Sequence, residues 1–207
     1  MSTDLPGWVP VEHRWLGLDR RRLKPALFVL VVALLLIYGW PAVNAVVPWD
    51  NPIKAGDVLD LGGGATAVPP VGWQLEDGTL VSDNTGVSPA RETVKLAKAG
   101  AVINMTGAAF DGTAAQFLDQ VLQSQDANAD ISGAPGTFTT TSGLAGVVRT
   151  ASGPAGDELL AAFKMSVTSP ASAPALLVEV STAPNSFQQY SGEIEALLRS
   201  ITPGSGA

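Results

Sequence analysis

Residues 25–47 read PALFVLVVALLLIYGWPAVNAVV, and the rest of the chain is organised around this stretch. None of its 23 residues carries a charge. At a rise of about 1.5 Å per residue, a helix of this length spans roughly 34 Å, which is enough for a hydrocarbon core of about 30 Å. A helix in a soluble core would carry a polar face, whereas this stretch is apolar all round. The sequence therefore predicts a transmembrane helix over residues 25–47.

The charges that flank this stretch predict its orientation. Basic residues gather immediately before it, and acidic residues predominate after it. An excess of Lys and Arg marks the cytoplasmic side of a membrane helix. Residues 1–24 are therefore expected to be a cytoplasmic tail with no fold of its own, and the C-terminal part to be extracytoplasmic, so that the protein sits in the inner (plasma) membrane with a single span. The basic residues nearest to the stretch are Arg20, Arg21, Arg22 and Lys24.

Aromatic residues near both ends of the stretch agree with a membrane-spanning helix. Amphipathic rings settle at the depth of the lipid headgroups, so they anchor the ends of a membrane helix. Pro41 lacks a backbone N–H group and is expected to kink or loosen the last turns. The candidate interface anchors are Trp15, Tyr38, Trp40 and Trp49.

A cleaved signal peptide is the alternative interpretation of this stretch. The most apolar run in this part of the chain, residues 23–38, has only 16 residues. The sequence Val43-Asn44-Ala45 then offers small residues at the two positions that a signal peptidase reads. The long leading segment and the apolar continuation to Val47 favour the uncleaved anchor. The chain has no cysteine, which excludes a lipidated cysteine, disulfides, thiol catalysis and thiolate metal sites.

The part of the chain beyond residue 47 is acidic and long enough for one domain. It carries seven Lys and Arg against 16 Asp and Glu, a net charge of −9. A nucleic-acid partner would require a basic face, so nucleic acid is excluded as a partner. Pro48 and Pro52 oppose regular structure, and the sequence predicts a linker over 48–67 with a short edge strand at 58–61. Residues 68–202 are predicted as the domain, and 203–207 as a tail.

Within this domain, period-two and period-3.6 patterns alternate along the chain. A hairpin is predicted over 93–106 with its turn at Ala99-Gly100, and a helix over 113–125 begins at a capping box made by Thr113 and Gln116. The other predicted strands are 73–75, 137–141, 145–152, 158–168 and 175–182. The fold class is therefore α+β, with six or seven antiparallel strands and two packed helices.

A final helix is predicted after Asn185, which would be its N-cap. Six apolar residues recur at helical spacing and share one face of this helix. The face either packs on the sheet as core or remains open as a partner-binding surface. Its residues are Phe187, Tyr190, Ile194, Leu197, Leu198 and Ile201.

The order of these elements resembles a known family. A Pro-x-Gly-Trp start at 70–73, a strand pair, a helix with a Phe-Leu-x-x-Val-Leu stripe, a strand meander and a closing helix near Ser200-Ile201 resemble the Mog1/PsbP-like fold. The nearest such proteins are actinobacterial envelope lipoproteins of the LpqN type, and the Lys-poor composition suits a high-GC actinobacterium. The resemblance implies a binding or scaffolding module without catalytic residues. This chain departs from it by having an apolar helix in place of a lipidated cysteine.

The residues themselves give no catalytic signature. The only histidine, His13, lies in the predicted cytoplasmic tail, which excludes a Ser-His-Asp triad outside the membrane. The acidic pairs at 57/60, 126/130 and 157/158 lack a metal-binding pattern and are expected to be solvated, as are Glu193 and Glu195 on the last helix. We therefore expect no enzyme activity, no cofactor and no metal; a hydrolase that uses two carboxylates is the remaining catalytic alternative.

Two functions fit these observations. The first is a non-catalytic accessory or scaffold subunit of a cell-envelope complex, with other integral membrane proteins as partners; lipid transporters of the Mce-type import or trehalose-lipid export class are the candidates. The second is a tethered domain that binds lipid or another small ligand between its sheet and a helix. A cavity of a few hundred Å³ would favour the second function, and a closed interior would count against it.

Overall fold

The structure, a computed structural model, describes residues 14–15, 18–19, 28–34, 50–83, 93–124, 134–153 and 156–204. The chain divides into two compact units, Met1–Asp50 and Asn51–Ala207.

The first unit contains a short strand pair and a short helix. Strands β1 (Arg14–Trp15) and β2 (Leu18–Asp19) pair antiparallel, where the sequence predicted no regular structure. Residues 28–34 are helical, and all of their large apolar side chains are exposed, led by Phe28 at 70%. No helix among the described residues is long and apolar enough to cross a membrane. The other residues of the predicted 25–47 span lie outside the described residues, so that prediction stays a prediction.

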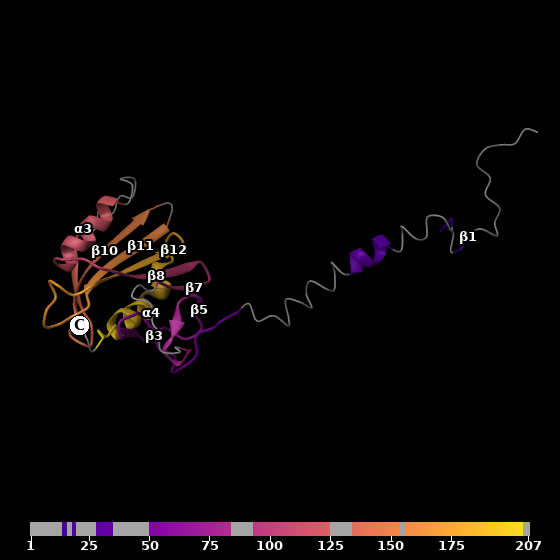
Figure 1. The fold of residues 1–207 in the computed structure, drawn as a ribbon. Helices are drawn as coiled ribbons and strands as arrows, with labels where there is room; N and C mark the ends of the chain where they lie inside the picture. The colour runs from indigo at the N-terminus through magenta and orange to yellow at the C-terminus, as the bar shows by residue number, and fades with distance from the viewer. Residues whose placement is uncertain are drawn as a thin grey trace, which may run out of the picture. The chain divides into compact units, whose positions relative to one another are not determined.

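The second unit is built on a seven-stranded antiparallel sheet, which confirms the predicted α+β class (Figure 1). Its hydrogen-bonded order is β5-β7-β8-β12-β11-β10-β9. The strands are β5 (Gln74–Asp77), β7 (Thr93–Lys98), β8 (Ala101–Ala108), β12 (Ala175–Thr182), β11 (Gly156–Lys164), β10 (Ala145–Gly153) and β9 (Gly136–Thr139). Ala99 and Gly100, with φ of 44° and 88°, form the two-residue turn of the predicted β7–β8 hairpin. Positive φ at both positions is what the twist of such a hairpin requires.

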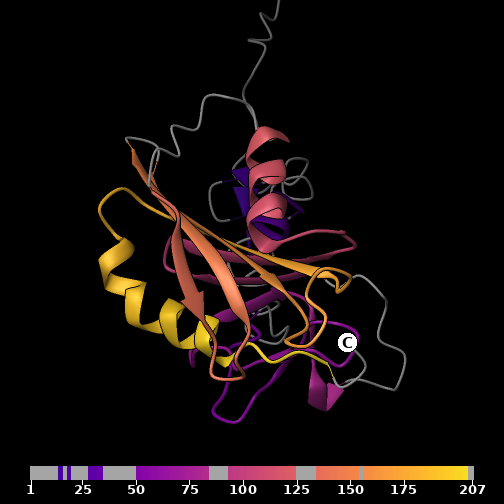
Figure 2. The ribbon, with the colours of Figure 1, turned by 90° about the vertical axis from the view of Figure 1, so that its left-hand side faces the viewer.

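Helices α3 (Ala114–Ser124) and α4 (Phe187–Ser200) cover opposite faces of this sheet (Figure 2). Successive side chains of a strand point to opposite faces, so a strand in the middle of the sheet supplies both cores. In β11, Leu159, Ala161 and Phe163 belong to the cluster that includes α4, whereas Leu160 and Ala162 belong to the cluster under α3. The run LLAAF in this strand is therefore apolar throughout because both faces are covered.

The apolar face of α4 is core. Tyr190, Ile194, Leu197 and Leu198 are at most 4% exposed, and Ile201 just beyond the helix is fully buried. Phe187 alone is only partly buried. The interpretation of this face as an open partner surface is therefore wrong for all but its first residue.

The predicted N-cap of α4 is also wrong by one residue. Ser186 is the N-cap and makes no side-chain cap bond, while Asn185 lies before it with φ of 60° in a turn. The first helical N–H group, that of Phe187, instead donates to Asp157 Oδ2 on β11 at 3.4 Å. A tertiary acceptor thus does what a local cap would have done.

The predicted linker before residue 68 belongs to the fold. Strands β4 (Thr66–Ala67), β3 (Leu59–Asp60) and β6 (Thr79–Leu80) form a three-stranded sheet in that order, so the predicted edge strand is central. Ile53 and Leu59 are 2% and 0% exposed. Thr66 and Thr202 exchange backbone hydrogen bonds of 3.0 and 2.9 Å, which ties this segment to the chain beyond α4. Prolines and glycines oppose long regular elements, but they do not prevent the residues between them from being buried.

Candidate functional site

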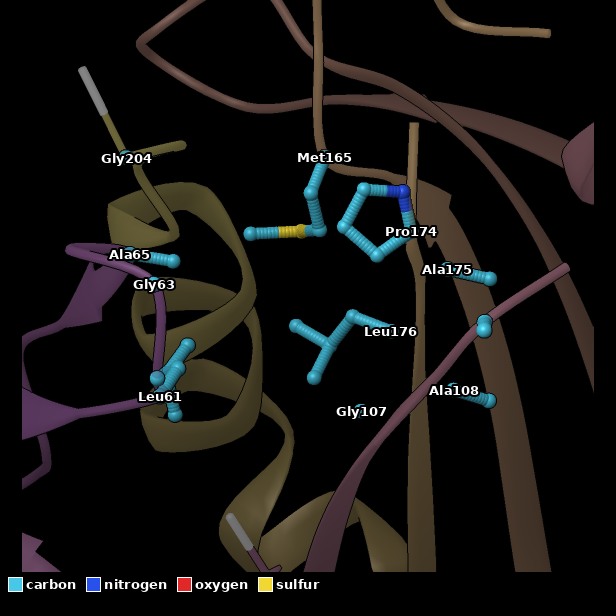
Figure 3. A pocket seen from close by; sticks show the side chains of 12 residues that line it. Leu61, Gly63, Ala65, Gly107, Ala108, Met165, Pro174, Ala175, Leu176 and Gly204 are labelled. Carbon is cyan, nitrogen blue, oxygen red and sulfur yellow. The ribbon is translucent and has the colours of Figure 1, made fainter. Parts of the chain in front are cut away.

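Three hollows in the second unit measure a few hundred Å³ each. The first, about 360 Å³, lies between the turn at 61–65 and the paired ends of β8, β11 and β12. The side chains of Met165 and Leu176 project toward the turn that carries Leu61 and Ala65 (Figure 3). No charged residue lines this hollow, and its side chains are all apolar, so its polar lining comes from backbone atoms. The residues are Leu61, Gly62, Gly63, Ala65, Gly107, Ala108, Ala109, Met165, Pro174, Ala175, Leu176 and Gly204.

The second hollow, about 430 Å³, lies on the α3 side of the sheet, and we name it the Lys164 cleft. Its walls come from the start of α3, the β9–β10 hairpin, the end of β11 and the loop that follows. Lys164 is the only charged residue among those that line it. The lining is Gly112, Thr113, Ala114, Ala115, Thr137, Phe138, Thr139, Gly143, Ala145, Gly146, Val147, Lys164, Ser166, Val167, Pro170 and Ala171.

Lys164 is 3% exposed, which is rare for a lysine. Its Nζ donates to the backbone carbonyl of Phe110 and lies 5.4 Å from the centre of the Phe110 ring. None of the ion pairs among the described residues includes it. Burial lowers the pKa of Lys164, and the negative charge of Asp111 partly opposes that shift. A desolvated ammonium on a residue that lines a cleft is the strongest chemical feature of this domain.

The start of α3 forms another wall of the Lys164 cleft. The predicted capping box is confirmed: Thr113 N–H donates to Gln116 Oε1 at 2.9 Å, and Gln116 N–H donates to Thr113 Oγ1 at 3.2 Å. Phe117 N–H donates to the Thr113 carbonyl at 3.0 Å. Between them, the N–H groups of Ala114 and Ala115 belong to the first turn, which has no carbonyl of its own helix to bind. Both residues line the cleft.

The third hollow, about 360 Å³, lies between α4 and the edge of the sheet at β9 and β10. Phe138, Val148, Leu159 and Phe187 supply much of its apolar wall, and Glu195 and Arg199 stand at it as an exposed ion pair of 2.6 Å. This hollow is where the sequence predicted a space between sheet and helix. It also contains Phe187, the one partly buried member of the α4 face.

A half-buried polar cluster on the α4 side was not predicted. Glu193, expected to be solvated, accepts from Trp73 Nε1 at 2.5 Å and pairs with Lys98 at 2.8 Å. The hydrogen bond from Lys98 is the main cause that holds the pKa of Glu193 below its ordinary value, against the opposing effect of burial. Trp73 is fully buried beside Tyr190, so its ring nitrogen needs this acceptor. The cluster has a structural role, because it joins the residue before β5 to β7 and α4.

Two other acids expected to be solvated are buried, since Asp60 and Asp157 are 5% and 7% exposed. Asp60 accepts from Gly62 N–H at 2.9 Å, and Asp157 accepts from the first turn of α4. Asp126 and Asp130 lie outside the described residues. Within the described part of the chain, no three His, Cys, Asp or Glu side chains gather closely enough to hold a metal ion.

The predicted membrane-anchor residues are placed only in small part. Trp15 lies in β1, and the other eight lie outside the described residues: Arg20, Arg21, Arg22, Lys24, Tyr38, Trp40, Pro41 and Trp49. Lys164 was missed by sequence reasoning. The available signal was its register, because Leu160, Ala162 and Lys164 share one face of a strand that is buried on both sides.

No protein-family model matches this chain, and no curated protein is similar to it in sequence. The case for a function therefore comes from the geometry of the domain and from the N-terminal sequence.

Proposed function

We propose that this protein is a single-pass inner-membrane protein whose extracytoplasmic domain binds a lipid or another small ligand without catalysis. The observation that carries the proposal is the Lys164 cleft, whose volume of about 430 Å³ is within the range of small-molecule sites, roughly 300–1,000 Å³. Its lining also has the usual character of such sites, with mostly apolar or small residues and a few polar groups. The Mog1/PsbP-like assignment is part of the proposal, and the order of strands and helices supports it.

The proposed tether is supported by the N-terminal sequence and by the exposed helix. Six large apolar side chains of residues 28–34 are between 37% and 70% exposed. A row of this kind is costly in water and is expected where lipid or protein covers it. The basic residues before it favour a cytoplasmic N-terminus.

The experiment blocks the cleft with a bulky side chain and identifies the small molecules that remain bound to the protein. The full-length protein is extracted from its native membrane, and small molecules bound to it are identified by native mass spectrometry. Ala115 is an exposed residue of α3 that lines the cleft, and Gln120 is an exposed residue of α3 that does not. We expect the wild type and Gln120→Trp to carry a ligand and Ala115→Trp to lose it. Equal ligand content in all three proteins would refute the proposed site.

A second candidate function is an accessory or scaffold subunit of a cell-envelope complex, with Mce-type lipid import or trehalose-lipid export as the classes that the family resemblance suggests. The observation that favours it is the hollow beside α4, because it adjoins the edge strand β9 and exposes part of Phe187. An edge strand can pair with a partner, and the adjacent hollow can take a side chain. Purification under mild detergent distinguishes the two functions: recovery of the protein without integral membrane partners would refute this one.

A further inference from the structure

The inference concerns the ligand class and rests on the proposed function. A lysine ammonium has three donors, and Lys164 spends one on the Phe110 carbonyl. Among the described residues no other acceptor for it is found. A buried charge without a full set of partners is costly, and a ligand that supplies an acceptor and a countercharge removes that cost.

The surroundings of Lys164 favour one negative charge on the ligand rather than two. Asp111 acts on Lys164 electrostatically but makes no ion pair with it, and Asp111 is exposed. Its charge therefore compensates part of the ammonium charge without filling the cleft. A dianion would exceed the single cation by one charge and would be repelled by the nearby carboxylate, whereas a monoanion matches the cation one to one.

The remaining walls fit the rest of such a molecule. The first turn of α3 also lines the cleft through Ala114 and Ala115, and the positive end of a helix favours an anion. The opposite wall, with Ala145, Val147 and Val167, is apolar and would contact a hydrocarbon body.

We propose that the Lys164 cleft binds a carboxylate attached to an apolar body, with the carboxylate on Lys164 Nζ and the start of α3. The fold itself requires neither the start of α3 nor Lys164 as a binding group. The helix α3 is already capped by its own residues. Ala162 shows that the same face of β11 accepts a small apolar side chain in place of a lysine.

The test compares three probes that share a phenyl ring: benzoate, benzyl alcohol and phenyl phosphate. Binding of each labelled probe to the full-length protein in nanodiscs is measured by equilibrium dialysis, and uptake by empty nanodiscs is subtracted. Lys164→Met removes the ammonium and keeps a long apolar stem. Lys95→Met is the matched control, because Lys95 lies on β7 in an exposed pair with Glu76 and does not line the cleft.

We expect the wild type and Lys95→Met to bind benzoate about ten-fold or more tightly than benzyl alcohol, as a charge-assisted hydrogen bond implies. Lys164→Met is expected to lose this preference and to keep its affinity for the alcohol. Unchanged benzoate binding by Lys164→Met, equal affinities of the wild type for acid and alcohol, or tighter binding of phenyl phosphate would each overturn the inference.

Two comparisons distinguish a failure of the carboxylate proposal from a failure of the ligand-binding function. The comparison of benzoate with benzyl alcohol on the wild type needs no variant, so it stands even if Lys164→Met fails to fold. Binding of the alcohol with no preference for the acid would refute the carboxylate and leave the ligand-binding function in place. Binding of none of the three probes would refute both.

Discussion

Replacing Leu197 with alanine tests whether the apolar face of α4 holds the domain together. Leu197 is 1% exposed and lies in the cluster that joins α4 to both sheets. The change removes three carbons, worth roughly 0.8 kcal/mol each in transfer from water, and leaves a cavity that the neighbours fill only in part. The free energy of unfolding should therefore fall by about 2–5 kcal/mol.

This loss is large enough to read directly from thermal unfolding. For a domain of about 150 residues, 1 kcal/mol shifts the midpoint by roughly 2–4 °C, so the expected decrease is about 6–12 °C for a loss near 3 kcal/mol. Tryptophan fluorescence reports the transition, since Trp73 is in the same core. Gln189→Ala is the control, because Gln189 is exposed on the same helix. A midpoint lowered by less than about 2 °C in Leu197→Ala would refute the assignment of this face as core.

Three further predictions use other parts of the chain. The pKa of Glu193 is lower in the folded than in the unfolded state, so its contribution to stability is complete at neutral pH and is lost as the pH falls through its folded pKa, below the ordinary 4.5. The urea midpoint followed from pH 7 to pH 3 should therefore fall further in the wild type than in Glu193→Gln. Gly146→Ala should destabilise by about 1–3 kcal/mol, because the added Cβ would lie 2.4 Å from the Phe163 ring, whereas Gly153→Ala on the same strand meets no atom within 4 Å; equal urea midpoints would contradict it. The protein should stay with membranes through a carbonate wash, and a mature N-terminus at Val46 would show cleavage after Ala45 instead.

Local patterns were enough for the strands and helices whose signals lie within a few residues. The β7–β8 hairpin was predicted because alternating residues flank a two-residue turn, and α3 because Thr113 and Gln116 form their hydrogen bonds within one turn. The start of the domain was mispredicted, since Ile53 and Leu59 are buried in a cluster that includes residues of α4, more than 100 residues further along the chain. No local signal in a Pro- and Gly-rich segment reports such a partner.

The sequence by itself determined the apolar N-terminal stretch, the antiparallel α+β class and the apolar face of α4, because each follows from spacing along the chain. Only the tertiary structure decided which charged residues are held by specific partners and which are buried. Glu193 and Lys164 look alike in sequence to any solvated acid or base, yet one is fixed by Trp73 and Lys98, and the other lies beneath the start of α3 in a cleft. The physical reason is that the environment of a charge is set by every element packed around it, and two of the four walls of the Lys164 cleft, the start of α3 and the β9–β10 hairpin, come from segments other than β11 and the loop that follows it.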